Sequence, residues 1–160
     1  MSVRRVTELN QLIGEALLRR APAGFEQVRV VVRYAGKTSE LKAVATMPDG
    51  SSTVLTGLSW DFTDAFDELR AQSYVPGQGA WFTATCTLST QGRLAFDFDD
   101  HEPTWRTPTA PGHYAEDLEL YPRDEEHTPG WLRQRLAEAR HEDLPDAAAS
   151  PGARRTGGVM

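Results

Sequence analysis

The chain has 160 residues, a formal net charge of −6 and one cysteine, so it fits a single domain and excludes an internal disulfide. The negative charge disfavours a general nucleic-acid binder, which needs clustered Lys and Arg for phosphate contacts. No apolar run approaches the ~20 residues of a membrane span, and the N-terminal stretch lacks the apolar core of a signal peptide, so we expect a cytoplasmic protein that binds no membrane.

The first half of the chain alternates between helical and strand-like spacing of its apolar residues. This pattern predicts a helix over residues 6–20, followed by strands within residues 25–34, 41–47 and 52–58. Thr7 is the expected N-cap of the helix, because its hydroxyl can accept a hydrogen bond from an unpaired backbone N–H. Short turns separate the strands, which favours antiparallel neighbours.

Further helices are predicted in the middle and at the end of the chain. Apolar spacing predicts a helix over residues 61–73, and Trp60 is expected to pack back on it as a hydrophobic staple. A short helix is expected within residues 114–121, and a final helix begins with Pro129 at its first position. The Ala-, Pro- and Gly-rich residues 142–160 are expected to form a disordered tail.

A hairpin over residues 80–98 is the clearest strand signal in the sequence. Its apolar face is expected to carry Phe82, Ala84, Cys86 and Leu88. Its second face is expected to carry Trp81, Thr83, Thr85 and Thr87. Together, these elements predict one α+β domain over residues 1–141. It is an antiparallel sheet of about four to five strands with N-terminal, central and C-terminal helices packed against it.

Acidic residues concentrate in residues 97–126. This segment contains ten acids and two bases, a net charge of 2 − 10 = −8, so the rest of the chain carries −6 − (−8) = +2. The acids are Asp97, Asp99, Asp100, Glu102, Glu116, Asp117, Glu119, Asp124, Glu125 and Glu126. The densest run of this segment, residues 97–102, is interpreted as a surface that faces a partner, as a solvated edge, or as a site for a divalent cation.

The sequence contains no recognisable catalytic constellation. Cys86 lies in mid-strand on the apolar face, where a buried, unreactive thiol is expected. No serine elbow and no glycine-rich phosphate loop is present. The histidines at positions 101, 113, 127 and 141 have no histidine one helical turn away, as a zinc site would favour. We therefore predict a protein that is not an enzyme, with no cofactor and no bound metal.

Four short motifs carry a resemblance to a known family. Residues 61–70 resemble a helix of the form F-x-x-L-R, and residues 79–84 resemble a G-x-W-F-T/S strand opening. Residues 94–103 resemble an F-x-Y-D-x-x-P strand end, and residues 117–132 resemble D-L-x-x-F/Y-P-R followed by P-x-W-L. Their order and spacing over residues 55–138 are similar to those of the YezG-like family of antitoxin, or immunity, proteins of bacterial polymorphic toxin systems.

The resemblance implies a protein that binds a cognate toxin C-terminal domain, of the nuclease or NAD-glycohydrolase class, and blocks it. A nuclease presents a basic cleft to phosphate, so an acidic surface with an aromatic anchor would fit it in place of substrate. The expected partner-binding residues are Asp97, Asp99, Asp100, Glu102, Trp105, Glu116 and Asp117.

Two other functions remain open from the sequence. An adaptor or chaperone for a secreted effector would also bind a protein, but away from the catalytic site of that effector. A small metal-dependent hydrolase would use Asp97, Asp99 and His101 as ligands. The sequence leaves the identity of the toxin and the oligomeric state open.

Overall fold

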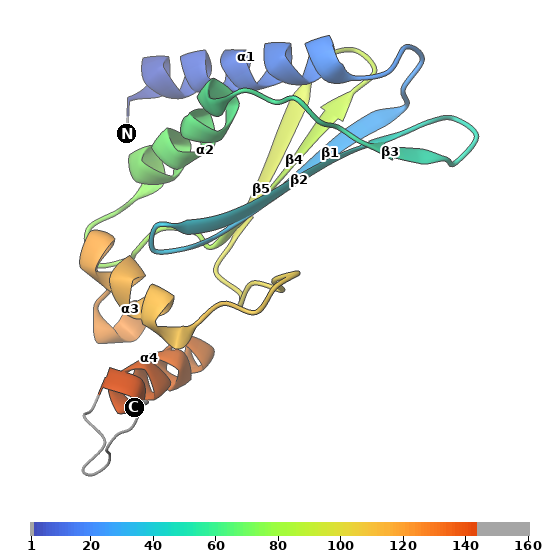
Figure 1. Cartoon of the computed structure of the whole chain (residues 1–160). Helices are drawn as coiled ribbons and strands as arrows, with labels where there is room; N and C mark the ends of the chain where they lie inside the picture. Colours follow the sequence, from blue (N-terminus) through green and yellow to red (C-terminus); the bar gives the residue numbers. More distant parts are fainter. Residues whose placement is uncertain (1, 144–160) are drawn as a thin grey trace.

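The structure, a computed structural model, describes residues 2–143 and is an α+β fold, as predicted. One antiparallel sheet has the strand order β3-β2-β1-β4-β5 (Figure 1). Its strands are β1 (Gln27–Ala35), β2 (Thr38–Thr46), β3 (Ser52–Val54), β4 (Thr83–Ser89) and β5 (Leu94–Asp99). The α-helices of the described part are α1 (Val3–Arg20), α2 (Trp60–Ser73), α3 (Pro111–Leu120) and α4 (Gly130–Asp143), with a short 3-10 helix, η1 (Glu125–His127), before α4.

Helices α1 and α2 cover one face of the sheet (Figure 1). Leu9, Ile13 and Leu17 recur at helical spacing on α1 and are fully buried against the sheet. Ser2 caps α1, because its hydroxyl accepts a hydrogen bond from the backbone N–H of Arg5. The prediction of Thr7 as the N-cap is wrong: helical spacing extends one turn further, and the Thr7 hydroxyl donates to the Val3 carbonyl inside the helix.

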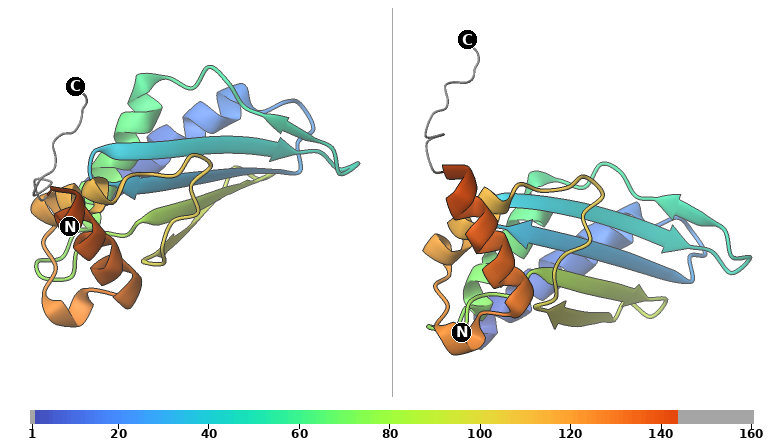
Figure 2. Two further views of the ribbon diagram at one scale, coloured as in Figure 1. Left: turned by 60° about the horizontal axis from the view of Figure 1, so that its bottom comes forward. Right: turned by 90° about the horizontal axis from the view of Figure 1, so that it is seen from below.

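Alternation along the strands separates the two faces of the sheet. Even-numbered residues of β1 such as Val28 and Val30 are fully buried beneath the helices, as are Cys86 and Leu88 on β4. The pairing of β1 with both β2 and β4 is antiparallel and without interruption. No helix lies across the middle of the second sheet face in the described residues, as Figure 2 shows.

A second apolar cluster lies at one end of the sheet, where α3 and α4 pack together (Figure 1). Its buried members are Ala35, Phe82, Tyr114 and Leu132. The prediction that Phe82 shares the face of Ala84 is wrong, as is the placement of Trp81 on the opposite face. The chain bends at Phe82 before β4 begins, so Trp81 enters the main core and Phe82 enters the second cluster.

Two other predictions about the helices need correction or fall outside the described part. Trp60 does not act as a staple: it is the first residue of α2 and is 84% exposed. Its position, two residues before the buried Phe62, turns it away from the sheet.

Helix α4 extends to Asp143, and the rest of the predicted disordered tail lies outside the described residues. Within residues 2–143, no helix has the length and apolar character needed to cross a membrane.

Candidate interaction surfaces

The prediction that Asp117 faces a partner is wrong, because Asp117 is completely buried. Its Oδ1 accepts hydrogen bonds from Nη1 of Arg70 at 2.6 Å and from the backbone N–H of Gly36 at 2.8 Å. Arg70 is only 1% exposed and also donates from Nε to the Trp81 carbonyl at 2.7 Å. A buried carboxylate with charged and backbone donors joins α2, α3 and the β1–β2 turn, so this pair is structural.

Glu116 and Trp105 also hold the protein's own elements together. Glu116 Oε1 accepts the backbone N–H of Lys37 at 2.7 Å, which fastens α3 to the β1–β2 turn. The Trp105 indole donates to the Tyr114 hydroxyl at 2.9 Å and packs against the second apolar cluster. Trp105 is half-buried, and so it is not the exposed anchor expected from the sequence.

Asp100 and Glu102 take part in ion pairs with the protein's own arginines. Asp100 Oδ1 lies 3.1 Å from Arg123 Nη2, and Glu102 Oε2 lies 2.7 Å from Arg135 Nε. The Asp100 side chain remains 55% exposed, whereas the Arg123 side chain is 1% exposed. These pairs connect the loop after β5 to the segment between α3 and η1 and to α4.

Asp97 and Asp99 lie together on the uncovered face of the sheet. They stand opposite Thr85 and Thr83 of β4 in the antiparallel register. Asp99 accepts the backbone N–H of His101 at 3.0 Å, and Asp97 is exposed and without an ion pair among the described residues. The seven residues predicted to form one acidic surface are therefore divided among the sheet face, the loop and the interior.

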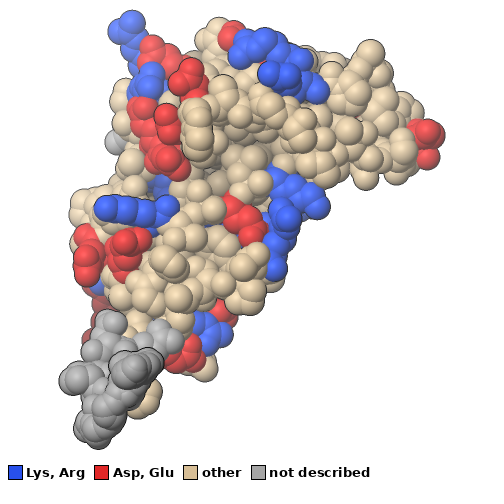
Figure 3. Space-filling model, in the orientation of Figure 1, with Lys and Arg blue, Asp and Glu red and all other residues tan. Residues whose placement is uncertain are grey.

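The uncovered sheet face carries a basic groove that the sequence reasoning missed. The groove has a volume of about 470 Å³ and lies over β1 and β2. Arg106, from the loop between β5 and α3, lies at its margin. It is lined by Gln27, Arg29, Val31, Arg33, Lys42, Val44, Thr46 and Arg106. Figure 3 shows basic side chains gathered in the hollow beneath the sheet. In the strand predicted within residues 25–34, Gln27, Arg29 and Arg33 lie on the face opposite the apolar residues. This polar face is the sequence signal from which the groove could have been predicted.

The loop after β5 borders this groove through Arg106. In Figure 2 it rises from β5 and passes over the open face before it reaches α3. The backbone N–H of Arg106 donates to both oxygens of Glu40, at 3.0 and 3.2 Å. Glu40 also pairs with Arg33 at 3.3 Å, so a single carboxylate fixes the loop against β2.

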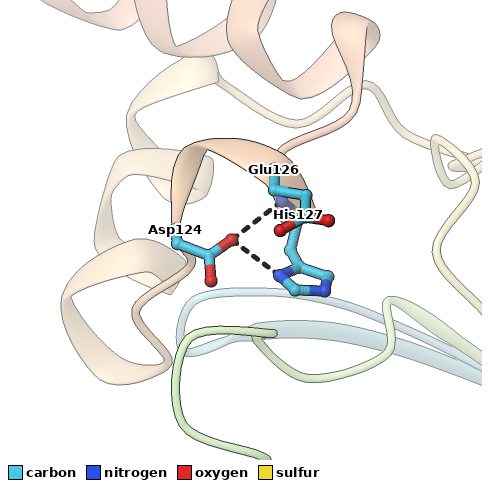
Figure 4. Close-up of side chains that lie close together, drawn as sticks. All are labelled: Asp124, Glu126 and His127. Atoms are coloured by element: carbon cyan, nitrogen blue, oxygen red, sulfur yellow. Dashed lines mark hydrogen bonds and ion pairs between the residues drawn. The ribbon is translucent and has the colours of Figure 1, made fainter.

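Asp124, Glu126 and His127 resemble a cation site in composition (Figure 4). One ligand atom from each lies within 4.8 Å of the others, and all three residues belong to the surface. Asp124 Oδ1 accepts the backbone N–H of His127 at 3.0 Å and lies 2.6 Å from its Nδ1. Capping of η1 by Asp124 explains this arrangement without an ion.

The groups that could act as nucleophiles or acids in the interior are in structural surroundings. Burial raises the pKa of the Cys86 thiol to about 12, so the thiol stays protonated at neutral pH. Burial and the hydrogen bond to Asp67 raise the pKa of Tyr34 well above its ordinary range. A hollow of about 200 Å³ beside Tyr34 is lined by Arg70, whose guanidinium is already held by Asp117 and Trp81.

No protein-family model matches this chain, and no curated protein is significantly similar to it. The similarity to the YezG-like family over residues 55–138 therefore stays a prediction from the sequence.

Proposed function

We propose that this chain is a binding protein of the immunity type, which docks a cognate toxin domain on the uncovered face of its sheet and blocks that toxin. The observation that carries the proposal is a broad sheet face that no helix covers in the described residues, with a groove of about 470 Å³ lined by charged and apolar side chains. Concave, mixed surfaces of this kind are typical of binding sites.

Two further considerations support a binding role. The buried charged pair of Arg70 and Asp117 is held by internal hydrogen bonds and serves the fold. The motif order over residues 55–138 is similar to that of immunity proteins, which points to a toxin as the partner. The acidic surface expected to meet this toxin is replaced in the proposal by the open sheet face.

The test is co-expression of the chain with the toxin domain encoded beside it. Growth should be restored, and the purified proteins should form a tight complex in which the toxin is inactive in vitro. A complex in which the toxin keeps its activity would favour the adaptor instead. Hydrogen exchange of the complex should show protection at residues 27–33 and 42–46. Protection confined to α1 and α2 would exclude the sheet face.

The hydrolase alternative has weaker geometric support. Asp97, Asp99 and His101 are not among the groups whose ligand atoms converge in the part of the chain that the structure describes. Asp99 Oδ1 lies 3.7 Å from Nδ1 of His101, whose side chain is 91% exposed. Calorimetry with Mg²⁺, Mn²⁺ and Zn²⁺ tests this alternative, and a stoichiometric heat signal lost in the Asp97→Asn, Asp99→Asn double variant would revive it.

A further inference from the structure

Cationic and apolar side chains alternate in both directions across the groove. The strand register places Arg29 opposite Val44, and Val31 opposite Lys42. Each valine therefore has a cation beside it across the strand pair, and Val31 also lies between Arg29 and Arg33 along its own strand. In an extended segment that lies along these strands, the side chains facing the groove would contact a cation and an apolar side chain in turn.

The cations of the groove outnumber the acids that neutralise them. Glu40 is the only acid in an ion pair with Arg33, and within residues 2–143 no ion pair is made by Arg29, Lys42 or the side chain of Arg106. The groove therefore keeps an excess of positive charge, which favours an anionic ligand.

We propose that the groove binds an acidic, extended segment of the partner protein, with carboxylates on the arginines and Lys42 and with aliphatic side chains on Val31 and Val44. This inference rests on the proposed function for its choice of a protein partner. Arginine's planar fork matches the two oxygens of a carboxylate, and the valines match short aliphatic side chains.

Two features favour an acidic protein segment over a nucleic acid. No aromatic side chain lines the groove, whereas proteins that bind single strands on a sheet stack bases on aromatic rings. The apolar valines have no counterpart on a phosphate backbone. The partner surface proposed here is thus acidic, whereas the sequence predicted a partner with a basic cleft.

The direct test is an NMR titration of the full chain with a short synthetic peptide that alternates glutamate and valine. Amide shifts should be confined to residues 27–33, 42–46 and 104–107, and affinity should fall as salt increases. The Arg29→Glu, Lys42→Glu double variant should bind at least about tenfold more weakly, since two charge-assisted contacts are lost. Equal binding by wild type and variant would overturn the inference.

A matched control separates the groove from the overall charge of the protein. The Arg4→Glu, Arg19→Glu double variant changes the net charge by the same −4, but both residues are exposed on α1, which covers the other sheet face. It should bind the peptide as the wild type does, and an equal loss in both double variants would contradict a specific groove. The Arg29→Gln, Lys42→Gln variant repeats the test if charge reversal disturbs folding.

Two further arms complete the experiment. Oligothymidylate of matching length should bind more weakly than the peptide, and tighter binding at the same amides would replace the acidic segment with a nucleic acid. If the Arg29→Glu, Lys42→Glu variant still protects cells from the toxin, the inference is wrong but the proposed function stands. If the peptide binds in the groove and the wild-type chain fails to protect, the proposed function is wrong and the anionic groove stands.

Discussion

The arginines at positions 70 and 29 belong to the same domain but have opposite surroundings. Arg70 is 1% exposed and makes hydrogen bonds with Asp117 and the Trp81 carbonyl. Arg29 is exposed on the uncovered face of the sheet and makes no ion pair in the described part of the chain. Charge that is already matched inside the fold stabilises structure, whereas charge left unmatched on an open face is available to a partner.

The largest expected effect is on the buried side of this contrast. Asp117→Asn removes the negative charge opposite Arg70 and leaves a buried cation uncompensated, so the free energy of unfolding should fall by about 3–5 kcal/mol. Urea denaturation followed by circular dichroism measures this loss. Asp97→Asn, an exposed control on the sheet face, should change stability by less than about 0.5 kcal/mol. Similar losses in the two variants would show that Asp117 is not structural.

The next effect concerns Gly36, whose backbone N–H donates to Asp117. Gly36 has φ +62, and a Cβ there would meet the Glu116 carboxylate and would lie 2.8 Å from the His113 carbonyl oxygen. Gly36→Ala should therefore cost about 3 kcal/mol, from left-handed strain and crowding together. Gly24→Ala is the matched control, because Gly24 has φ +80 and a Cβ there would have no atom within 4 Å. Its free energy of unfolding should fall by only about 1–2 kcal/mol, from the left-handed strain alone.

A pH-dependent loss of stability, absent at neutral pH, follows from the buried thiol. Burial raises the pKa of Cys86 from its ordinary 9.0 to about 12, so the folded state retains a proton that the unfolded chain releases. This contribution to stability is complete below pH 9 and is lost as the pH rises from 9 towards 12, by about 1 kcal/mol per pH unit. Denaturation of the wild type and of Cys86→Ala across this range isolates it. Rapid reaction of the native thiol with Ellman's reagent at neutral pH would contradict the burial.

The smallest stability effect belongs to the open face. The Arg29→Glu, Lys42→Glu variant should unfold within about 0.5 kcal/mol of the wild type, because neither side chain makes a hydrogen bond or an ion pair within residues 2–143. Thermal unfolding of this variant beside the wild type measures the difference. A marked destabilisation would place these cations in the same structural class as Arg70, and the contrast between the two regions would disappear.

Residues near the bend and in the acidic segment mark where prediction from the sequence ended. The alternation of β4 was readable from Ala84, Cys86 and Leu88, but the bend that moves Phe82 to the second cluster was not. Trp60 and Trp105 were assigned from local spacing and neighbouring charge. Their actual exposure depends on which direction a helix faces and on the distant Tyr114 hydroxyl.

The amino-acid sequence by itself determined the elements and the fold class, because hydrophobic period and turn residues act over a few neighbouring positions. Only the tertiary structure decided which charges are matched. Arg70 and Asp117 are 47 residues apart, and Glu40 lies 66 residues from Arg106. Ion pairing depends on distances of a few ångströms in space, so the same run of acids contributes to a core, to surface links and to an open sheet face.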